Sequence, residues 1–381
     1  MKIYILPYTL KTKLITSKLH SGIDKSMLMT IEALDSLGYD YRVPIIDGDD
    51  MDGFVLLKPG LENPKEFCKN RKNVKELRSL ILDDIRAYQP NLILSMHELN
   101  SFYKDLNDLD IPIIYQLHEI PGSFTFLSNS NILHEMSKRH TLLCVSKFHK
   151  DKTESYFNRE KKEWNFRGID FDDFLPSAFI SREPEVQESD GTIKHVSVAS
   201  RDKKTFLIFD WFENENKKVF TTSNHLQSSS STSKNKEYFD KYYGQYANDI
   251  VLDCDREELL KEYGKAMCAF VGLASYDTYT ITSLEALSMG VPLILKGNSK
   301  YEHPAFEMCC DEMKKYVFIV NTKQEALEAL EKIKKFTMDD RRYLSALCAE
   351  KNSMASFKNK LVSIANGAIT KYNANAQNKL F

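Results

Sequence analysis

The first half of the chain alternates short apolar runs with longer amphipathic stretches. The apolar runs are rich in isoleucine, leucine and valine, which is typical of strands buried in a parallel sheet. The strands expected from these runs are Ile3–Leu6, Tyr41–Ile45, Leu92–Ser95, Ile113–Gln116 and Leu142–Val145. Helical periodicity predicts one helix over Ile23–Leu37, with Gly38 as its C-cap, and another over Val74–Tyr88, ending before Pro90. Strands that alternate with helices in this way predict a doubly wound parallel sheet.

A second series of the same kind follows a polar stretch at Ser181–Lys194. Its expected strands are His195–Ala199, Lys218–Thr222, Ile250–Leu252, Cys268–Gly272, Val291–Leu295 and Tyr316–Val320. Its expected helices are Phe206–Phe212, Arg256–Lys265, Thr282–Met289 and Lys323–Lys334, and a last helical stretch covers Met354–Tyr372. We therefore expect an α/β protein with an N-terminal domain at 1–182 and a second domain at 193–352. A C-terminal helix and tail at 353–381 would pack back on the first domain.

The composition limits the number of domains and the classes of protein to which this chain can belong. With 381 residues the chain is long enough for two separate cores. A formal net charge of −2 gives no global basic field, so binding to nucleic acid would need a local patch. The N-terminal apolar run closes at Pro7, which suits a buried strand better than a signal peptide, and no membrane span is visible. The cysteines form no Cys-x-x-Cys pair, which indicates reduced thiols in a cytoplasm.

The segment from Asp277 to Pro292 is the sharpest candidate for chemistry. It predicts a loop, a short helix, and then a Gly-x-Pro turn into a strand. Thr282 or Ser283 is expected to cap this helix, whose free N–H groups form an anion site. Glu285, in the first turn, is placed to accept two neighbouring hydroxyls of a ribose, and Asp277 lies on the preceding loop. A capped helix with an exposed acid is the alternative interpretation.

Cations suited to a diphosphate follow the first strand of the second domain. Arg201 is followed closely by Lys203 and Lys204. A guanidinium matches phosphate oxygens in pairs, and an ammonium adds a point charge. Either lysine fits this role and we favour Lys204. A solvated basic turn is the alternative.

Candidate residues in the first domain gather where strands end. Open parallel sheets place their ligands at this edge. His97 and Glu98 follow one predicted strand, and His118 and Glu119 follow the next. Gly22 comes just before a helix, where a glycine lets the backbone approach a phosphate or a sugar. We expect these side chains to serve binding or catalysis.

The ordered set of these segments resembles the family 4 glycosyltransferases. That family carries an acidic residue, seven further residues and a Glu that begins a Glu-Ala-x-x-x-Gly-x-Pro stretch. Here the stretch runs from Asp277 through Glu285 to Pro292, with Asp where the family has Glu. The segment Cys144–Phe148, which contains Ser146, is similar to the family's strand-end Val-Ser segment, and Phe166–Pro176 is similar to the stretch that closes its first domain. The resemblance spans roughly residues 1 to 365.

This resemblance implies the GT-B architecture, with two Rossmann-like domains facing a central cleft. It implies transfer of a sugar from a nucleotide-sugar, most simply a UDP-sugar, with retention of configuration. Arg201, Lys204 and the helix start near Thr282 would hold the diphosphate, and His118 would lie near the reacting sugar. The departing diphosphate would accept the acceptor's proton. No metal and no other cofactor would be obligatory, so Asp49-Asp50 and Asp172-Asp173 are expected to be surface or turn acids.

The acceptor is predicted less sharply. More distantly, the chain resembles the DNA α-glucosyltransferases of T-even bacteriophages in Tyr115-Gln116 and in Leu252–Cys254. That resemblance implies double-stranded DNA bearing hydroxymethylcytosine as acceptor, in the cytoplasm of a phage host, and glucose or a pentose such as arabinose as the sugar. His97, Glu98 and Ser146 would flank the acceptor.

Local basic clusters bear on the DNA hypothesis. They lie at 69–75, 147–152 and 159–162, where they either follow a DNA backbone or are solvated helix faces. One alternative is an enzyme that acts on cell-surface polysaccharide or on a lipid-linked saccharide. An alternative of another class is a non-catalytic binding protein that keeps the fold.

Overall fold

The computed structural model divides the chain into two compact units. The first comprises Met1–Ser177 together with Ala355–Phe381, and the second comprises Ala178–Met354. The residues that the structure describes are 1–7, 22–46, 52–61, 63, 66–67, 70–96, 102–118, 130–164, 171–180, 185–196, 204–221, 235–272, 279–297 and 303–377.

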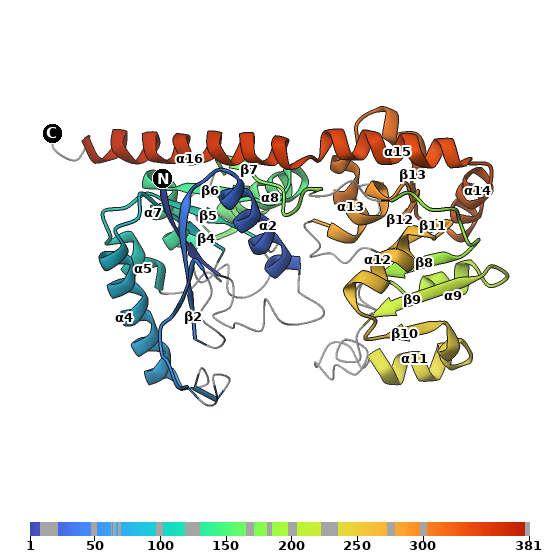
Figure 1. Ribbon diagram of the computed structural model, residues 1–381, viewed down its shortest axis with the longest axis horizontal. Coiled ribbons are helices and arrows are strands. Elements are labelled where there is room, and N and C mark those ends of the chain that lie inside the picture. The colour runs from blue at the N-terminus through green and yellow to red at the C-terminus, as the bar shows by residue number, and fades with distance from the viewer. Residues whose placement is uncertain are drawn as a thin grey trace. The chain divides into compact units, whose positions relative to one another are not determined.

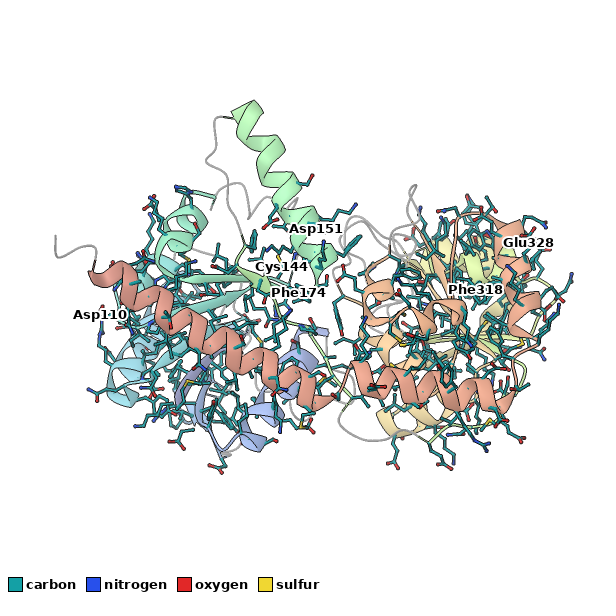
Figure 2. All side chains as sticks on the ribbon, turned by 90° about the horizontal axis from the view of Figure 1, so that it is seen from above. Asp110, Cys144, Asp151, Phe174, Phe318 and Glu328 are labelled. Carbon is teal, nitrogen blue, oxygen red and sulfur yellow. The ribbon has the colours of Figure 1, made fainter. Side chains whose placement is uncertain are left out.

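The first unit is built on a seven-stranded sheet in the order β3-β2-β1-β4-β5-β6-β7 (Figure 1). The strands are β1 (Lys2–Leu6), β2 (Asp40–Ile45), β3 (Phe54–Leu56), β4 (Leu92–Ser95), β5 (Ile113–Gln116), β6 (Thr141–Cys144) and β7 (Asp173–Phe174). Every neighbouring pair is parallel. At the β6–β7 edge, Cys144 is in register with Phe174, and both side chains appear in Figure 2. The predicted doubly wound parallel sheet is confirmed.

Helices connect the strands of this unit. They are α2 (Gly22–Ser36), α4 (Arg71–Tyr88), α5 (Phe102–Asn107), α7 (Ser130–Arg139), α8 (Lys147–Trp164) and α16 (Met354–Gln377). The central strands are buried along their whole length, and α4 covers them with Leu77, Ile81 and Ile85. Because these strands are buried on both faces, they appear in the sequence as continuous apolar runs without alternation, and these runs were sufficient to locate them.

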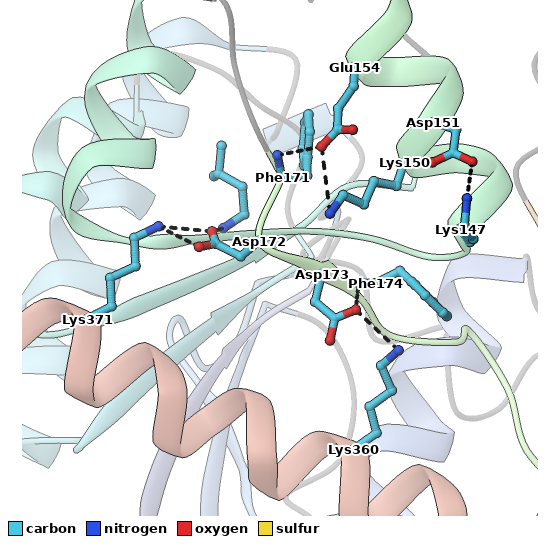
Figure 3. A network of polar contacts seen from close by, with 11 residues as sticks. Lys147, Lys150, Asp151, Glu154, Phe171, Asp172, Asp173, Phe174, Lys360 and Lys371 are labelled. Carbon is cyan, nitrogen blue, oxygen red and sulfur yellow. Dashed lines mark hydrogen bonds and ion pairs between the residues drawn. The ribbon is translucent and has the colours of Figure 1, made fainter.

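The last helix, α16, closes the first unit with an apolar stripe and flanking charges. Its stripe buries side chains spaced three or four residues apart: Phe357, Leu361, Ile364, Ala365, Ala368 and Tyr372. Beside the stripe, Lys371 Nζ contacts both carboxylate oxygens of Asp172 at 2.8 and 3.0 Å (Figure 3). Lys360 lies 3.3 Å from Asp173. The two aspartates therefore hold the C-terminal helix against the end of the sheet.

The second unit has a six-stranded parallel sheet in the order β10-β9-β8-β11-β12-β13. Its strands are β8 (Ile193–Val196), β9 (Lys217–Thr221), β10 (Ile250–Leu252), β11 (Cys268–Val271), β12 (Leu293–Lys296) and β13 (Val317–Val320). Its helices are α9 (Leu207–Trp211), α11 (Asn235–Tyr243), α12 (Arg256–Gly264), α13 (Ile281–Ser288), α14 (Lys323–Ile333) and α15 (Met338–Lys351), with short 3₁₀ turns η1 (Gly244–Asp249), η2 (Pro304–Met308) and η3 (Glu312–Tyr316). The strand order reverses between β8 and β11, which is where such sheets open a crevice for ligands.

The chain enters and leaves the second unit side by side. The backbone N–H of Ile180 donates to the carbonyl of Asn352 at 2.8 Å, and Ile180 forms a parallel bridge with Ser353. Within the unit, the buried guanidinium of Arg341 on α15 donates to the carbonyls of Ala266 and Gly264 at 2.8 and 2.6 Å. These contacts fix α15 to the loop before β11.

Gly290, between α13 and β12, is required by two independent features. Its φ of +71° lies in the left-handed region, and a Cβ added there would lie 2.3 Å from the carbonyl oxygen of Arg341. We expect Gly290→Ala to lower the free energy of unfolding of the second unit by at least about 2 kcal/mol, through backbone strain and overpacking. Thermal and urea unfolding measure the change.

Gly367 in α16 supplies the matched control. No atom lies within 4 Å of the Cβ that alanine would add there. Gly367→Ala should therefore stabilise the first unit by about 0.5–1 kcal/mol, because glycine is a poor helix former. A Gly290→Ala variant as stable as the unmodified chain would contradict the packing described for α15.

Candidate functional site

Lys204 lies in the turn that follows β8 and leads into α9. It is exposed, and its φ of +54° is unusual for a residue with a side chain. The next residue holds this turn in place, because the hydroxyl of Thr205 lies 3.5 Å from Nε2 of His195. Nδ1 of His195 in turn contacts the carbonyl oxygen of Phe270 on β11 at 2.9 Å. A buried histidine thus ties the Lys204 turn to the two strands at the reversal point of the sheet.

Helix α13 begins earlier than the sequence predicts. The backbone N–H groups of Ser283 and Leu284 both donate to the carbonyl of Thr280, so Thr280 is the N-cap and the helix starts at Ile281. The expectation that Thr282 or Ser283 caps the helix is wrong. Both residues lie inside its first turn, Thr282 half-buried and Ser283 fully buried. The N–H groups of Ile281 and Thr282 precede the first of these intrahelical bonds, and such N–H groups at a helix start are a favourable place for an anion.

Glu285 is the fifth residue of α13, just beyond the first turn in which the sequence analysis placed it. Its carboxylate is half-buried and lies near the buried Tyr263 of α12. Burial above all, and then the charge of Glu285, raise the pKa of the Tyr263 phenol well above its ordinary value. Among the described residues, the hydroxyls of Tyr263 and Ser283 have no hydrogen-bond partner. Buried polar atoms of this kind beside a carboxylate are typical of a site that a ligand completes.

In the first unit, His118 follows β5 and lies beside the start of α8. Burial of its ring, followed by the neighbouring His149, lowers the pKa of His118 to about 3. The ring is therefore neutral at physiological pH, and a neutral imidazole can donate and accept hydrogen bonds without adding charge.

Ser146 follows β6 and begins α8. Its Oγ accepts a hydrogen bond from the backbone N–H of His149 at 3.0 Å, and the N–H of Val145 donates to Nδ1 of His149 at 3.4 Å. Ser146 thus has a structural role at the start of the helix. His149 was not predicted from the sequence, because nothing in its local pattern distinguishes it from other helix residues.

Of the remaining predicted site residues, only Gly22 lies in the described part of the chain. Gly22 is the first residue of α2. Five predicted residues lie outside the described residues: His97, Glu98, Glu119, Arg201 and Asp277. In the second unit the structure places Lys204 after β8, and Thr282, Ser283 and Glu285 on α13. In the first unit it brings His118 and Ser146 close to the same residue, His149.

Two of the three lysines in the basic cluster at 147–152 form ion pairs within α8. Lys147 pairs with Asp151 at 2.5 Å, and Lys150 lies 3.7 Å from Glu154 (Figure 3). Glu154 also accepts a hydrogen bond from the backbone N–H of Phe171 at 3.0 Å. This part of α8 is a solvated face of paired charges, the alternative noted for the cluster.

Two further observations concern the described part of the chain. It contains no group of three or more His, Cys, Asp or Glu side chains arranged to hold a metal ion. None of its helices has both the length and the apolar character that a membrane crossing requires.

Comparison with known proteins identifies the fold. No protein-family model matches the chain, and no curated protein matches it by sequence. A glycosyltransferase from Rickettsia africae matches with a TM-score of 0.62 at 14% identity, covering 97% of this chain and 98% of the other. HepE of Anabaena in complex with UDP and glucose matches with a TM-score of 0.66 at 11% identity, over 96% and 100% of the two chains.

A sucrose-phosphate synthase from Thermosynechococcus elongatus matches with a TM-score of 0.68 at 11% identity, over 97% of this chain and 99% of that one. Together with the two parallel sheets, these matches show that the chain has the GT-B fold. The fold class predicted from the sequence is confirmed. The more specific likenesses, to family 4 and to the phage enzymes, stay predictions.

The neutral state of His118 is testable by titration. Because its pKa in the folded chain lies below the ordinary value of 6.5, the stability that it contributes is complete above pH 6.5 and is lost as the pH falls toward 3. We expect the ring ¹³C and ¹H resonances of His118 to stay constant between pH 8 and pH 5. Nuclear magnetic resonance of histidine-labelled protein measures this, with His118→Asn to assign the signal. A titration midpoint near 6.5 would contradict the burial of the ring.

Proposed function

We propose that this chain is a retaining glycosyltransferase that moves a sugar from a UDP-sugar to an acceptor hydroxyl and needs no obligatory metal. One observation carries the proposal. The second sheet carries Lys204, the start of α13 and Glu285 after its two strands β8 and β11, which meet where the strand order reverses. A cation, a helix start and a carboxylate are what a nucleoside diphosphate needs.

The donor is proposed to bind entirely through the second unit. Arg201 and Lys204 neutralise the diphosphate, and the helix start adds the backbone N–H of Thr282 and the hydroxyl of Ser283 as donors. Glu285 accepts hydrogen bonds from the two ribose hydroxyls. Its proximity to the unsatisfied hydroxyls of Tyr263 and Ser283 supports this assignment, because a bound ribose brings both donors and acceptors. Asp277 is proposed to contact the transferred sugar.

The chemical step follows from charge development on the leaving group. The bond between the sugar C1 and the diphosphate oxygen breaks, and a bond forms from C1 to the acceptor oxygen on the same face. The acceptor proton passes to an oxygen of the departing diphosphate, so no enzymic nucleophile takes part. Arg201 and Lys204 stabilise the negative charge that grows on that diphosphate. This is the contribution that makes a divalent metal dispensable.

The first unit is proposed to supply contacts to the reacting sugar. His118, held neutral, and Glu119 hydrogen-bond the sugar near its anomeric carbon, and the backbone at Gly22 approaches the donor. HepE, whose fold this chain shares, has been solved with UDP and glucose and with UDP-glucose. We carry that donor class to this chain as part of the proposal.

Glu285 provides the direct test of the donor site. Loss of its charge-assisted hydrogen bonds in Glu285→Gln should weaken UDP binding by about 10- to 100-fold. Turnover of UDP-glucose, measured as release of UDP, should fall at least as far. Glu328→Gln on the exposed face of α14 is the control, and it should change neither quantity.

Two results of that experiment would point elsewhere. Equal UDP affinity in Glu285→Gln and the unmodified chain would remove Glu285 from the donor site. Tight UDP binding that is lost in Glu285→Gln, with no turnover of any donor, would favour the non-catalytic binding protein.

For the acceptor we propose hydroxymethylcytosine in double-stranded DNA, flanked by His97, Glu98 and Ser146. The support is the resemblance of Tyr115-Gln116 and Leu252–Cys254 to the phage DNA α-glucosyltransferases. Within 69–75, Lys72 and Lys75 are exposed. Two of the three lysines at 147–152 are engaged by carboxylates, which reduces the positive charge that this cluster offers a DNA backbone. Cell-surface polysaccharide or a lipid-linked saccharide is the rival acceptor.

Nucleoside mass spectrometry separates these acceptors. Incubation with UDP-glucose or a UDP-pentose and hydroxymethylated DNA should add one sugar mass to hydroxymethylcytidine, and unmodified DNA should gain none. The double variant K72Q/K75Q should reduce the salt dependence of DNA binding by about one unit for each phosphate that the two lysines neutralise. Sugar transfer to an oligosaccharide without any modified nucleoside would assign the enzyme to saccharide acceptors instead.

A further inference from the structure

Lys296 is a buried cation at the carboxyl end of β12. It is the last residue of that strand and is 9% exposed. The other buried lysines of this unit have their charge or donors satisfied. Lys194 pairs with Asp190 at 2.5 Å and Glu262 at 3.5 Å, and Lys217 donates to the three carbonyls of Phe212, Glu213 and Glu215. Among the described residues, no carboxylate lies within ion-pair distance of Lys296.

The ammonium of Lys296 has one donor left over. It donates to the carbonyl of Gly297 at 2.9 Å and to Oδ1 of Asn321 at 3.3 Å, and it lies 5.9 Å from the centre of the Trp211 ring. An ammonium carries three N–H donors. Two protein acceptors therefore account for two of them, counted over the part of the chain that the structure describes.

A second cation, Lys204, lies near enough for its charge to act on Lys296. Among the described residues, no carboxylate forms an ion pair with Lys204. Burial lowers the pKa of Lys296, the charge of Lys204 lowers it further, and Glu325 offsets part of the effect. The Glu325 carboxylate is itself engaged by the backbone N–H of Asn321 at 2.6 Å. Lys204 follows β8 and Lys296 ends β12, with only β11 between these strands, so both lie along the carboxyl edge. Two ammonium groups held together in this way favour an anion between them.

We propose that Lys296 is a second phosphate-binding ammonium of the donor site, where it and Lys204 together hold the diphosphate of the nucleotide-sugar. The inference rests on the proposed function and adds a residue to it, from a strand end that the sequence motifs do not include. An oxygen of the diphosphate takes the third N–H of Lys296, and the negative charge relieves the repulsion between the two lysines.

A purely structural role makes a different prediction. If Lys296 only links Gly297 to Asn321, its loss would lower stability and leave the affinity for UDP unchanged. If it binds phosphate, its loss would remove affinity for UDP and not for uridine, which lacks phosphate.

The experiment compares variants by isothermal titration with UDP and uridine and by thermal unfolding without ligand. Lys296→Met keeps an unbranched side chain that is one atom shorter and removes the charge, and we expect it to weaken UDP binding about tenfold or more while uridine binding stays unchanged. Lys204→Gln should weaken UDP binding similarly. Lys217→Met is the matched control. It should lower Tm, because three carbonyls lose their donor, and retain UDP affinity within about twofold.

A second pair of variants keeps the test decisive if Lys296→Met fails to fold. Lys296→Gln retains a donor for Gly297 and Asn321 without the charge, and Lys296→Arg retains the charge. Loss of UDP affinity in the glutamine variant with retention in the arginine variant supports the proposal. UDP affinity within about twofold of the unmodified chain in Lys296→Gln overturns it. If the unmodified chain binds neither UDP nor ADP, the proposed donor site is wrong. That result differs from the one that rejects only the role of Lys296, in which the unmodified chain and Lys296→Gln both bind UDP.

Discussion

The carboxyl ends of parallel strands all point to one edge of a sheet, and in this chain every neighbouring pair of named strands is parallel. The residues that follow β8, β11 and β12 are therefore brought to one edge although they are far apart in sequence. The contact from the Thr205 hydroxyl to His195, and from His195 to the carbonyl of Phe270, makes that convergence specific, because it fixes the turn of Lys204 relative to the strand that precedes α13. The proposed donor site in the second unit depends on this alignment.

The second unit also buries polar groups at positions where an apolar side chain would give a more stable protein. Tyr263, Ser283 and Lys296 are all enclosed, and each retains hydrogen-bonding capacity that the described protein atoms do not use. A fold gains nothing from such groups by itself, since an unsatisfied buried donor or acceptor lowers stability. A bound polar ligand would supply partners for such groups. Lys194 and Lys217 of the same unit, in contrast, are engaged by carboxylate and carbonyl oxygens.

The sequence located the long buried strands, because their apolar runs leave little choice of structure. It also located the helices α2, α4, α9, α12, α13, α14 and α16, but not α5, α7, α8, α11 and α15. It missed β3 and β7, which are short and half-buried and so carry no clear alternation. The start of α13 was misplaced because hydroxyl residues at Thr280, Thr282 and Ser283 compete as caps, and only the backbone bonds to the Thr280 carbonyl decide among them. Lys204 and Glu285 were identified from a resemblance. Tyr263, His149 and Lys296 were not, since their roles arise from neighbours that are distant in sequence.

One consequence follows from the way the first unit closes. Its sheet is complete by residue 177, yet α16 joins it only after the whole second unit has been synthesised. On the ribosome, the apolar surface that α16 covers is therefore exposed while residues 178–354 emerge and fold. Phe357, Leu361 and Tyr372 cover that surface last, and Lys371 then contacts Asp172. A shortened translation product that stops before α16 would leave this apolar surface exposed to chaperones and proteases.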